Sequence, residues 1–280
     1  MTDRYAVFGN PVGHSLSPRI HALFAAQTGQ DLRYEAILAP RDAFAATLAD
    51  FRAAGPDPAR GANVTVPFKE EAFRLSTRRS PRAEAAGAVN TLSFLDEGQT
   101  LGDNTDGAGL VRDIEQNLGL QLAGRRLLVL GAGGAARGAL LPLLLTQPER
   151  LVIANRTADK AVRLAAEFAR LPGCALDAKP EPAGFEELGT AGTFDVVINA
   201  TSAGLDGAAL PLPGSVFADG TLAYEMVYGR ETAFMAQARA AGSRVADGLG
   251  MLVEQAGEAF FVWRGMRPDT TAVLAALAKA

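Results

Sequence analysis

The segment "LLVLGAGGAARGALL" (residues 127–141) constrains the fold more than any other feature of the sequence. An apolar run typical of a buried strand leads directly to Gly131, Gly133 and Ala136, which satisfy the spacing G-x-G-x-x-[GA]. This order predicts a strand, a tight turn and a helix whose first amides can bind a pyrophosphate. A glycine-rich turn without a ligand has the same spacing, so the motif alone only favours a dinucleotide site. The residues expected at that site are Gly131, Ala132, Gly133, Gly134 and Ala135.

The next strand-like segment, "LVIAN", indicates which dinucleotide is bound. An NAD-binding domain usually carries Asp or Glu at this strand end, roughly 20 residues beyond the glycines. Here the strand ends at Asn155, and Arg156, Thr157 and Lys160 follow without a carboxylate at the strand end. A guanidinium binds a phosphate through paired hydrogen bonds, which favours NADP and its ribose 2′-phosphate. The alternative is a polar helix start, with Thr157 as its cap and Lys160 merely solvated.

Strand-like and helix-like segments alternate along the chain, a rhythm typical of mostly parallel sheets. The alternation restarts at Arg125, which predicts a second domain. We therefore expect an α/β protein with two domains, the second being a Rossmann-type NADP-binding domain. Residues 251–265 and 268–280 are expected to form two helices that could pack back on the first domain, although the sequence alone leaves this undecided. The proline-rich segment 179–184 is expected to be a loop.

Composition limits the class of partner. The chain has 280 residues, a net charge of −4 and no basic block, so we expect a small-molecule partner and neither a nucleic-acid nor a membrane surface. Its most apolar run is interrupted by glycines, Arg137 and Pro142, which argues against a transmembrane helix. A single cysteine, Cys174, and a start without signal-peptide features predict a cytoplasmic protein without a cysteine metal cluster. No metal site is expected, and the lack of heptads favours a monomer or weak homodimer.

A nicotinamide enzyme needs a group that gives or takes a proton, and histidine is the usual one. The chain has two histidines: His21 falls in an apolar helix pattern and is expected to be packed, whereas His14 lies in a loop where a binding or a structural role is equally open. Lys69, in "ANVTVPFKEEAF", follows a strand and lies in the first turn of a predicted helix, where the helix dipole disfavours a cation. Because α/β folds bind ligands at the carboxyl ends of strands, Lys69 is the stronger candidate.

A second candidate is Asp106 in "LGDNTDGAGL". Its carboxylate could orient the Lys69 ammonium and would raise the lysine pKa, against the lowering expected from the helix N-terminus. Asp103 and Asp106 also suit turns, and for each residue alone the turn is the favoured interpretation.

Eight segments, in the same order and spanning nearly the whole chain, resemble shikimate dehydrogenases. They are "AVFGNPVGHSLSPRIH", "GANVTVPFKEEA", "AGAVNTL", "GDNTDGAGL", "LGAGGAARG", "NRT", "NATSAG" and "ADGLGMLVEQA". That family reversibly reduces 3-dehydroshikimate to shikimate with NADPH in aromatic amino-acid biosynthesis, so the resemblance implies this reaction and NADP. It also implies a discontinuous substrate-binding and catalytic domain, residues 1–106 and 249–280, and a NADP-binding domain, residues 107–248.

The resemblance also implies roles for residues at matching positions. Lys69 and Asp106 would form the catalytic pair. The substrate would be bound by Ser15, Ser17, Thr65, Lys69, Asn90, Asp106, Tyr228 and Gln255. The cofactor would be bound by the glycine-rich segment, the residues at the "NRT" strand end, and Met226 and Gly248. Each position has an ordinary structural alternative, such as a helix cap for Ser17 or a solvated helix position for Gln255.

Two departures from the family pattern are Glu225, where Asp is common, and Pro81, near an acidic residue of some relatives. Two other functions stay open: a quinate/shikimate dehydrogenase that uses NAD, and a non-catalytic metabolite sensor on the same scaffold. The basic Arg156 argues against the first, and the presence of both Lys69 and Asp106 argues against the second.

Overall fold

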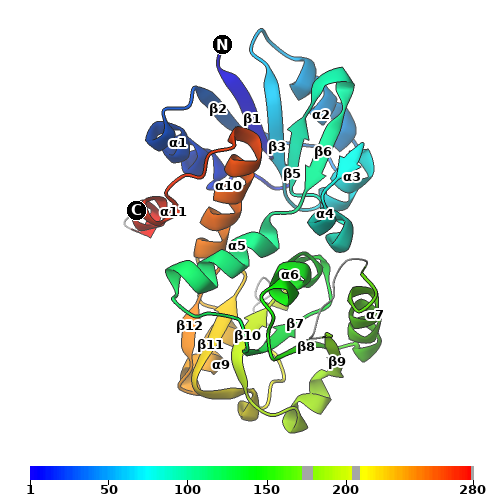
Figure 1. Cartoon of the computed structure of the whole chain (residues 1–280), viewed down its shortest axis with the longest axis vertical. Coiled ribbons are helices and arrows are strands. Elements are labelled where there is room, and N and C mark those ends of the chain that lie inside the picture. Colours follow the sequence, from blue (N-terminus) through cyan, green and yellow to red (C-terminus); the bar gives the residue numbers. More distant parts are fainter. Residues whose placement is uncertain (172–178, 204–208, 279–280) are drawn as a thin grey trace. The chain divides into compact units, whose positions relative to one another are not determined.

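The computed structural model describes residues 1–171, 179–203 and 209–278 (Figure 1). Two compact units make up the chain, one of Met1–Gly109 with Leu252–Ala280 and the other of Leu110–Met251. The chain leaves the first unit within helix α5 (Asp106–Arg112) and returns within helix α10 (Leu249–Arg264). The predicted α/β class with two sheets is confirmed. Cys174 lies outside the described residues.

The sheet of the first unit is mostly parallel and has the strand order β2-β1-β3-β5-β6-β4. Only β5 runs antiparallel to its neighbours, because a turn at Asp96–Gly98 returns the chain directly into β6. The strands are β1 (Asp3–Gly9), β2 (Leu32–Leu38), β3 (Ala59–Val64), β4 (Arg78–Arg79), β5 (Thr91–Phe94) and β6 (Thr100–Asp103).

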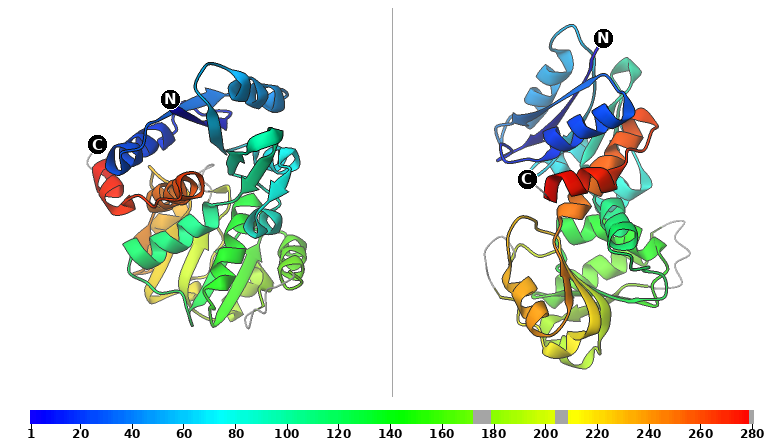
Figure 2. Two further views of the ribbon diagram at one scale, coloured as in Figure 1. Left: turned by 45° about the horizontal axis from the view of Figure 1, so that its top comes forward. Right: turned by 90° about the vertical axis from the view of Figure 1, so that its left-hand side faces the viewer.

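Helices cover both faces of this sheet. Successive side chains of a strand point to opposite sides, and apolar side chains of β1 pack on both of them. Along β1, Phe8 packs edge-on against Phe44 and Phe51 of α2, whereas Tyr5 packs against Trp263 of α10. The predicted C-terminal helices are α10 and α11, and α11 lies beside α1 (Figure 2). The remaining helices of this unit are α1 (Ser17–Thr28), α2 (Phe44–Ala53), α3 (Lys69–Leu75), α4 (Pro81–Ala86) and α11 (Thr270–Ala278).

The sheet of the second unit is parallel and has the order β12-β11-β10-β7-β8-β9. In chain order its first strand lies beside its fourth, which is the Rossmann arrangement and places a topological switch point between β7 and β10. The strands are β7 (Arg126–Leu130), β8 (Arg150–Asn155), β9 (Glu181–Gly184), β10 (Phe194–Asn199), β11 (Phe217–Glu225) and β12 (Arg244–Ala246). The described helices include α6 (Gly134–Leu145), α7 (Ala158–Phe168) and α9 (Ala233–Ala240).

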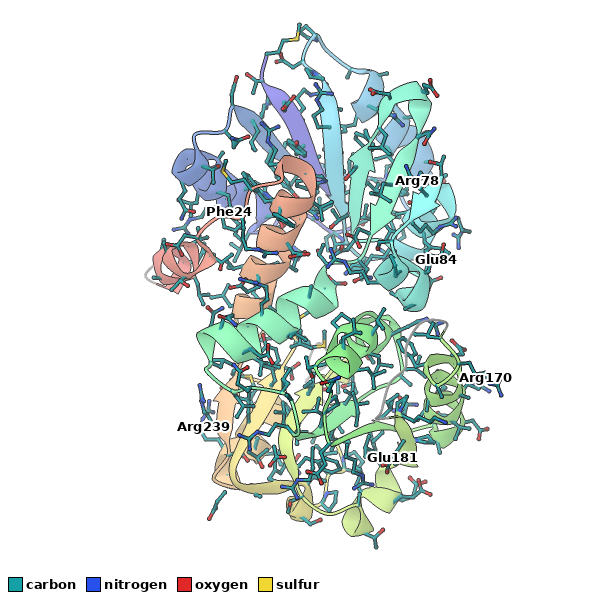
Figure 3. The ribbon with its side chains drawn as sticks, viewed as in Figure 1. Phe24, Arg78, Glu84, Arg170, Glu181 and Arg239 are labelled. Atoms are coloured by element: carbon teal, nitrogen blue, oxygen red, sulfur yellow. The ribbon has the colours of Figure 1, made fainter. Side chains whose placement is uncertain are left out.

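The predicted loop at residues 179–184 is wrong in part, because Glu181–Gly184 form strand β9 and pair with β8. Strand β9 is at the sheet edge, where a proline does not break a ladder because its missing N–H can face away from the partner strand. Glu181, labelled in Figure 3, also forms an ion pair with Arg150 at 2.7 Å.

Two features are absent from residues 1–171, 179–203 and 209–278. None of the helices there combines the length and the apolar character that a membrane span requires. The same residues contain no group of three or more His, Cys, Asp or Glu side chains placed to hold a metal ion.

His21 is packed in an aromatic cluster formed by α1, β2 and α10, as its helix pattern predicts. Its ring stacks on Tyr34, with centroids 4.2 Å apart, and also contacts Phe24, Phe260 and Trp263. Burial among these rings disfavours the charged imidazolium and lowers the pKa of His21 from 6.5 to about 3. The folded protein therefore holds His21 in its neutral form.

We expect His21 to make the protein less stable in mild acid. The unfolded chain takes up this proton as the pH falls through 6.5 and the folded chain does not, so the group costs about 1.4 kcal/mol of unfolding free energy between about pH 7.5 and about pH 5.5. Urea unfolding followed by circular dichroism at both pH values checks this. His21→Phe should lose less stability on acidification than the wild type, and His14→Phe, at an exposed position, controls for removal of an imidazole. Equal losses in the wild type and His21→Phe would contradict the prediction.

Candidate functional site

An ammonium and a carboxylate meet in the first unit where two helices begin. Lys69 is the first residue of α3, and Asp106 is the first residue of α5. Lys69 Nζ lies 2.6 Å from Asp106 Oδ2, and the two side chains are 29% and 16% exposed. The predicted place of Lys69 in the first turn of a helix is thus confirmed, and the pair is accessible enough to meet a small molecule.

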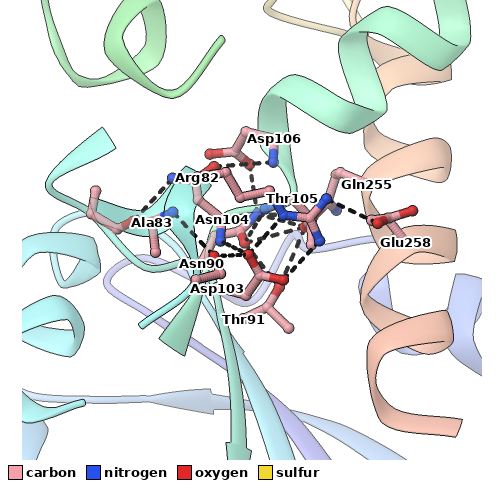
Figure 4. A network of polar contacts seen from close by, with 12 residues as sticks. Arg82, Ala83, Asn90, Thr91, Asp103, Asn104, Thr105, Asp106, Gln255 and Glu258 are labelled. Atoms are coloured by element: carbon pink, nitrogen blue, oxygen red, sulfur yellow. Dashed lines mark hydrogen bonds and ion pairs between the residues drawn. The ribbon is translucent and has the colours of Figure 1, made fainter. Parts of the chain in front are cut away.

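Asn90 holds the residues around this pair (Figure 4). Its side-chain nitrogen lies 2.8 Å from Asp106 Oδ1, 3.0 Å from Thr105 Oγ1 and 3.3 Å from Gln255 Oε1. Its side-chain oxygen accepts a hydrogen bond from the Thr105 amide at 2.9 Å. The structure therefore brings Lys69, Asp106, Asn90 and Gln255 together, although they come from four segments of the chain.

Ser15, Ser17 and Thr65 follow the carboxyl ends of β1 and β3, which are neighbouring strands. The Ser17 amide donates to Ser15 Oγ at 3.2 Å, and a Cβ added at Gly9 would lie 2.5 Å from the Thr65 side chain. The alternative role of Ser17 as a helix cap is wrong, because α1 begins at Ser17 itself and Leu16 occupies the cap position. Among the described hydrogen bonds, none joins these three side chains to Lys69 or Asp106.

Two polar residues that support the site were not found from the sequence. Thr105 accepts a hydrogen bond from Asn90 and is fully buried. Asn63 Nδ2 donates to the Asn90 carbonyl oxygen at 3.1 Å, and Asn63 Oδ1 accepts from the Tyr34 hydroxyl at 2.8 Å. In the sequence, Asn63 stands out as a polar residue inside the apolar strand "ANVTV". A buried amide requires hydrogen-bond partners, so this position indicates a polar contact.

The glycine-rich turn of the second unit has the geometry of an anion site. Gly131 has φ +105°, which favours glycine and turns the chain from β7 toward α6. Helix α6 begins at Gly134. Its cap residue is Gly133, so no side chain caps the first amides of the helix. A Cβ added at Gly133 or Gly134 would meet nothing within 4 Å, and Ala135 is also exposed. The turn therefore has room and N–H donors for a phosphate, with Ala132 inside it.

The end of β8 lies beside the glycine-rich turn, since the Gly131 amide donates to the Ala154 carbonyl oxygen at 2.7 Å. Arg156 and Lys160 are exposed there, and neither has an ion-pair partner in the part of the chain that the structure describes. Asn155 Nδ2 donates to the Thr157 carbonyl oxygen at 2.9 Å. Thr157 occupies the N-cap position of α7, as the alternative interpretation predicts, but its side chain makes no cap hydrogen bond.

Met226 and Gly248 lie against each other after β11. A Cβ added at Gly248 would be 2.2 Å from the Met226 carbonyl oxygen, so only glycine fits without moving the backbone. Tyr228 follows two residues later, and burial raises its pKa, which keeps its hydroxyl protonated. These three residues belong to the second unit, whereas Lys69 and Asp106 belong to the first.

Glu225, which departs from the family pattern, organises the start of this loop. Its fully buried carboxylate accepts hydrogen bonds from Asn199 Nδ2 at 2.7 Å, Thr232 Oγ1 at 2.9 Å and the Val227 amide at 3.2 Å. The end of β10, the end of β11 and the start of α9 are thereby joined through one side chain. In this chain, glutamate thus reaches three separate donors at that position.

Comparison with known families covers most of the chain. A model described as the shikimate dehydrogenase substrate binding domain matches residues 7–92. A model described as shikimate / quinate 5-dehydrogenase matches residues 113–205, and one described as the shikimate 5'-dehydrogenase C-terminal domain matches residues 248–278.

Individual proteins are similar over nearly their full length. The chain is 62% identical to a curated shikimate dehydrogenase (NADP(+)) of Dechloromonas aromatica (strain RCB), covering 99% of this chain and 98% of that protein. The crystal structure of an Ael1 enzyme from Pseudomonas putida matches with a TM-score of 0.90 and 49% identity, covering 99% and 98% of the two chains. Shikimate 5-dehydrogenase from Thermus thermophilus, solved in complex with NADP(H) and shikimate, matches with a TM-score of 0.83 and 37% identity, covering 100% and 99%.

Proposed function

We propose a function on the premise that the chain belongs to the shikimate dehydrogenase family. It catalyses the reversible NADPH-dependent reduction of 3-dehydroshikimate to shikimate. The observation that carries this proposal is the Lys69–Asp106 pair, 2.6 Å apart and held by Asn90, beyond the carboxyl ends of β3 and β6. A sensor that only binds a metabolite has no need of a proton-transferring pair. The chain is therefore an oxidoreductase that acts on a CH–OH group.

NADP is the cofactor, and it supplies the hydride in the reduction or accepts it in the oxidation. The glycine-rich turn, residues 131–135, binds the pyrophosphate through backbone amides at the start of α6. Arg156 and Lys160 bind the 2′-phosphate, supported by Asn155 and Thr157 at the same strand end. Met226 and Gly248 border the nicotinamide.

The substrate is an anionic ring that carries hydroxyl groups. Ser15 and Ser17 bind its carboxylate through their hydroxyl groups. Thr65, Asn90 and Gln255 bind ring hydroxyls, which is supported by the amide network that joins Asn90 to Gln255. Tyr228 of the second unit also contacts the substrate.

Lys69 carries out the proton transfer. When the ketone is reduced, its oxygen gains negative charge and needs a proton, and the Lys69 ammonium supplies both the compensating charge and the proton. Asp106 accepts a hydrogen bond from Lys69 Nζ and so directs the ammonium. In the oxidation direction, Lys69 takes the hydroxyl proton back.

We further propose a cytoplasmic enzyme that is a monomer or weak homodimer and binds neither nucleic acid nor membranes. The acidic net charge and the absence of a basic block in the sequence argue against nucleic-acid and membrane binding, and the single cysteine is consistent with a reducing compartment. We also assign a function to each domain: residues 1–106 and 249–280 bind the substrate, and residues 107–248 bind NADP.

One assay tests the proposed function. Purified protein with NADPH and 3-dehydroshikimate should oxidise NADPH, measured by absorbance, with a higher kcat/KM than with NADH. Shikimate should be oxidised more efficiently than quinate. Better efficiency with NADH and quinate would favour the quinate/shikimate dehydrogenase alternative, and no turnover of either substrate would favour the sensor.

We expect Lys69→Met to reduce kcat by roughly 10²–10⁴-fold, the usual contribution of a positioned acid or base. Lys69→Arg should lose kcat to a similar degree, because it keeps the cation beside Asp106 but cannot release a proton. Steady-state kinetics and substrate binding measured by calorimetry check both. Near-normal turnover in Lys69→Arg would mean that the residue only holds charge.

We expect Arg156→Gln to raise the KM for NADPH by roughly 10–100-fold, since a charge-assisted hydrogen bond to a phosphate contributes about 1.5–3 kcal/mol. The KM for NADH, which has no 2′-phosphate, should stay within about twofold of the wild type. Arg163→Gln removes the same charge from an exposed position farther along α7 and is the matched control. Equal losses for both cofactors, or equal losses in the control, would contradict the assignment.

A further inference from the structure

Arg82 joins two carboxylates that lie on different elements of the first unit. It is the second residue of α4, and its side chain is 23% exposed. Its guanidinium forms a fork with Asp103 at the end of β6, with Nε 2.7 Å from Oδ1 and Nη2 2.7 Å from Oδ2. Its remaining nitrogen, Nη1, donates to Glu258 Oε1 of α10 at 2.9 Å. One side chain therefore ties α4, β6 and α10 together (Figure 4).

Each of the three tied segments carries a residue of the proposed site. Asp106 follows Asp103 by three residues, and Gln255 precedes Glu258 by three residues, so it lies on the same face of α10. The segment after α4 carries Asn90. The backbone N–H of Asn90 donates to the Asp103 carbonyl oxygen at 3.0 Å. The fork thus links the three segments a second time, in addition to the direct contacts of Asn90 with Asp106 and Gln255.

The turn from Asp103 to Asp106 is held largely by side-chain hydrogen bonds, among them that of Asn104 Nδ2 to the Ala88 carbonyl oxygen and that of Ser80 Oγ to Asp103 Oδ1. Three successive amides donate to side-chain oxygens: Asn104 to Asp103 Oδ1 at 2.7 Å, Thr105 to Asn90 Oδ1 at 2.9 Å, and Asp106 to Asn104 Oδ1 at 3.2 Å. The first of these bonds ends on the carboxylate oxygen that Arg82 also holds. A change in the position of Asp103 is therefore passed to the backbone of Asn104, whose side chain in turn accepts the Asp106 amide.

The network is balanced in charge. Arg267 supplies a second guanidinium to Glu258, so two cations face two carboxylates. Burial alone would raise the pKa of Asp103, but the hydrogen bonds and charge of Arg82 hold that pKa below its usual value. Asp103 thus stays ionised and keeps both oxygens available as acceptors for the fork and the turn.

We propose that Arg82 is a positioning residue, which sets the place of Asp106 and Gln255 by holding Asp103 and Glu258. Replacement of a whole buried ion pair by apolar residues is often neutral or stabilising, so the presence of such a pair is weak evidence for a role in stability alone. The contacts of Arg82 are better explained by a role in fixing the relative positions of the three segments that carry site residues. Small displacements of catalytic groups cost roughly 10²-fold in rate. The kinetic consequences rest on the proposed function.

Arg264 offers a matched control in the same unit. Its side chain is 19% exposed, and it forms an ion pair with Asp3 and a hydrogen bond to Gln30 Oε1 at 2.7 Å. It lies at the far end of α10 from Gln255, next to the start of β1. Arg264→Met therefore removes a comparable partly buried ion pair without touching the 103–106 turn.

The test compares Arg82→Met with Arg264→Met by hydrogen–deuterium exchange and steady-state kinetics. In Arg82→Met, peptides that contain the amides of residues 104–106 should exchange about 10-fold faster than in the wild type, because Asp103 Oδ1, which accepts the first of these amides, loses the Arg82 fork and the turn loosens. The kcat with 3-dehydroshikimate should fall by about 10–100-fold, whereas the KM for NADPH should stay within about twofold. Arg264→Met should leave the exchange of residues 104–106 and kcat close to the wild type.

Two further variants keep the proposal testable if Arg82→Met does not fold. Arg82→Lys retains the charge without the fork, and it should restore part of kcat and part of the exchange protection. Glu258→Gln weakens the contacts of α10 with Arg82 and Arg267 but leaves the Arg82–Asp103 fork, so it should raise the KM for substrate more than it lowers kcat. Equal exchange at residues 104–106 and equal kcat in the Arg82 and Arg264 variants would overturn the positioning role. If the wild type does not turn over 3-dehydroshikimate, the proposed function fails, and the exchange comparison still decides the role of Arg82.

Discussion

The buried side-chain amide of Asn90 is the interaction on which the arrangement of the candidate site depends. Its exposed fraction is 2%, so its oxygen and nitrogen cannot turn to water for partners. They bind the Thr105 amide and hydroxyl, Asp106 Oδ1 and Gln255 Oε1. Because an unsatisfied buried amide costs about 1–3 kcal/mol per lost partner, these segments hold one relative arrangement. The backbone of Lys69 is tied to the residue before Asn90, because the Lys69 carbonyl oxygen accepts a hydrogen bond from the Val89 amide.

Local patterns in the sequence predicted the features that depend on neighbouring residues. Gly131 takes a positive φ directly after a buried strand, and that requirement is readable from the glycine spacing alone. Lys69 begins a helix after a strand, and His21 lies on the apolar face of α1, both as their surroundings indicate. The strand at residues 181–184 escaped prediction because its proline, Pro182, is tolerated only at a sheet edge, and the edge is a property of the assembled sheet.

Contacts between distant segments could not be predicted in the same way. Arg82 and Glu258 are 176 positions apart, and nothing near either one identifies the other. Asp103 was interpreted as a turn former, and it does accept the Asn104 amide, but its second role as the acceptor of a guanidinium fork needed the strand register. The division of function between the two units, and the roles of the individual site residues, stay predictions.

Trp263 gives the molecule a built-in optical label. It is the single tryptophan of the chain, it belongs to the first unit, and its indole N–H donates to the Leu92 carbonyl oxygen at 3.0 Å while its ring packs against Tyr5. Indole emission therefore reports on the packing of α10 against the first sheet and is silent about the second unit. Circular dichroism senses the helices of both units, so the two signals together can separate a protein that unfolds in one step from one whose halves unfold independently.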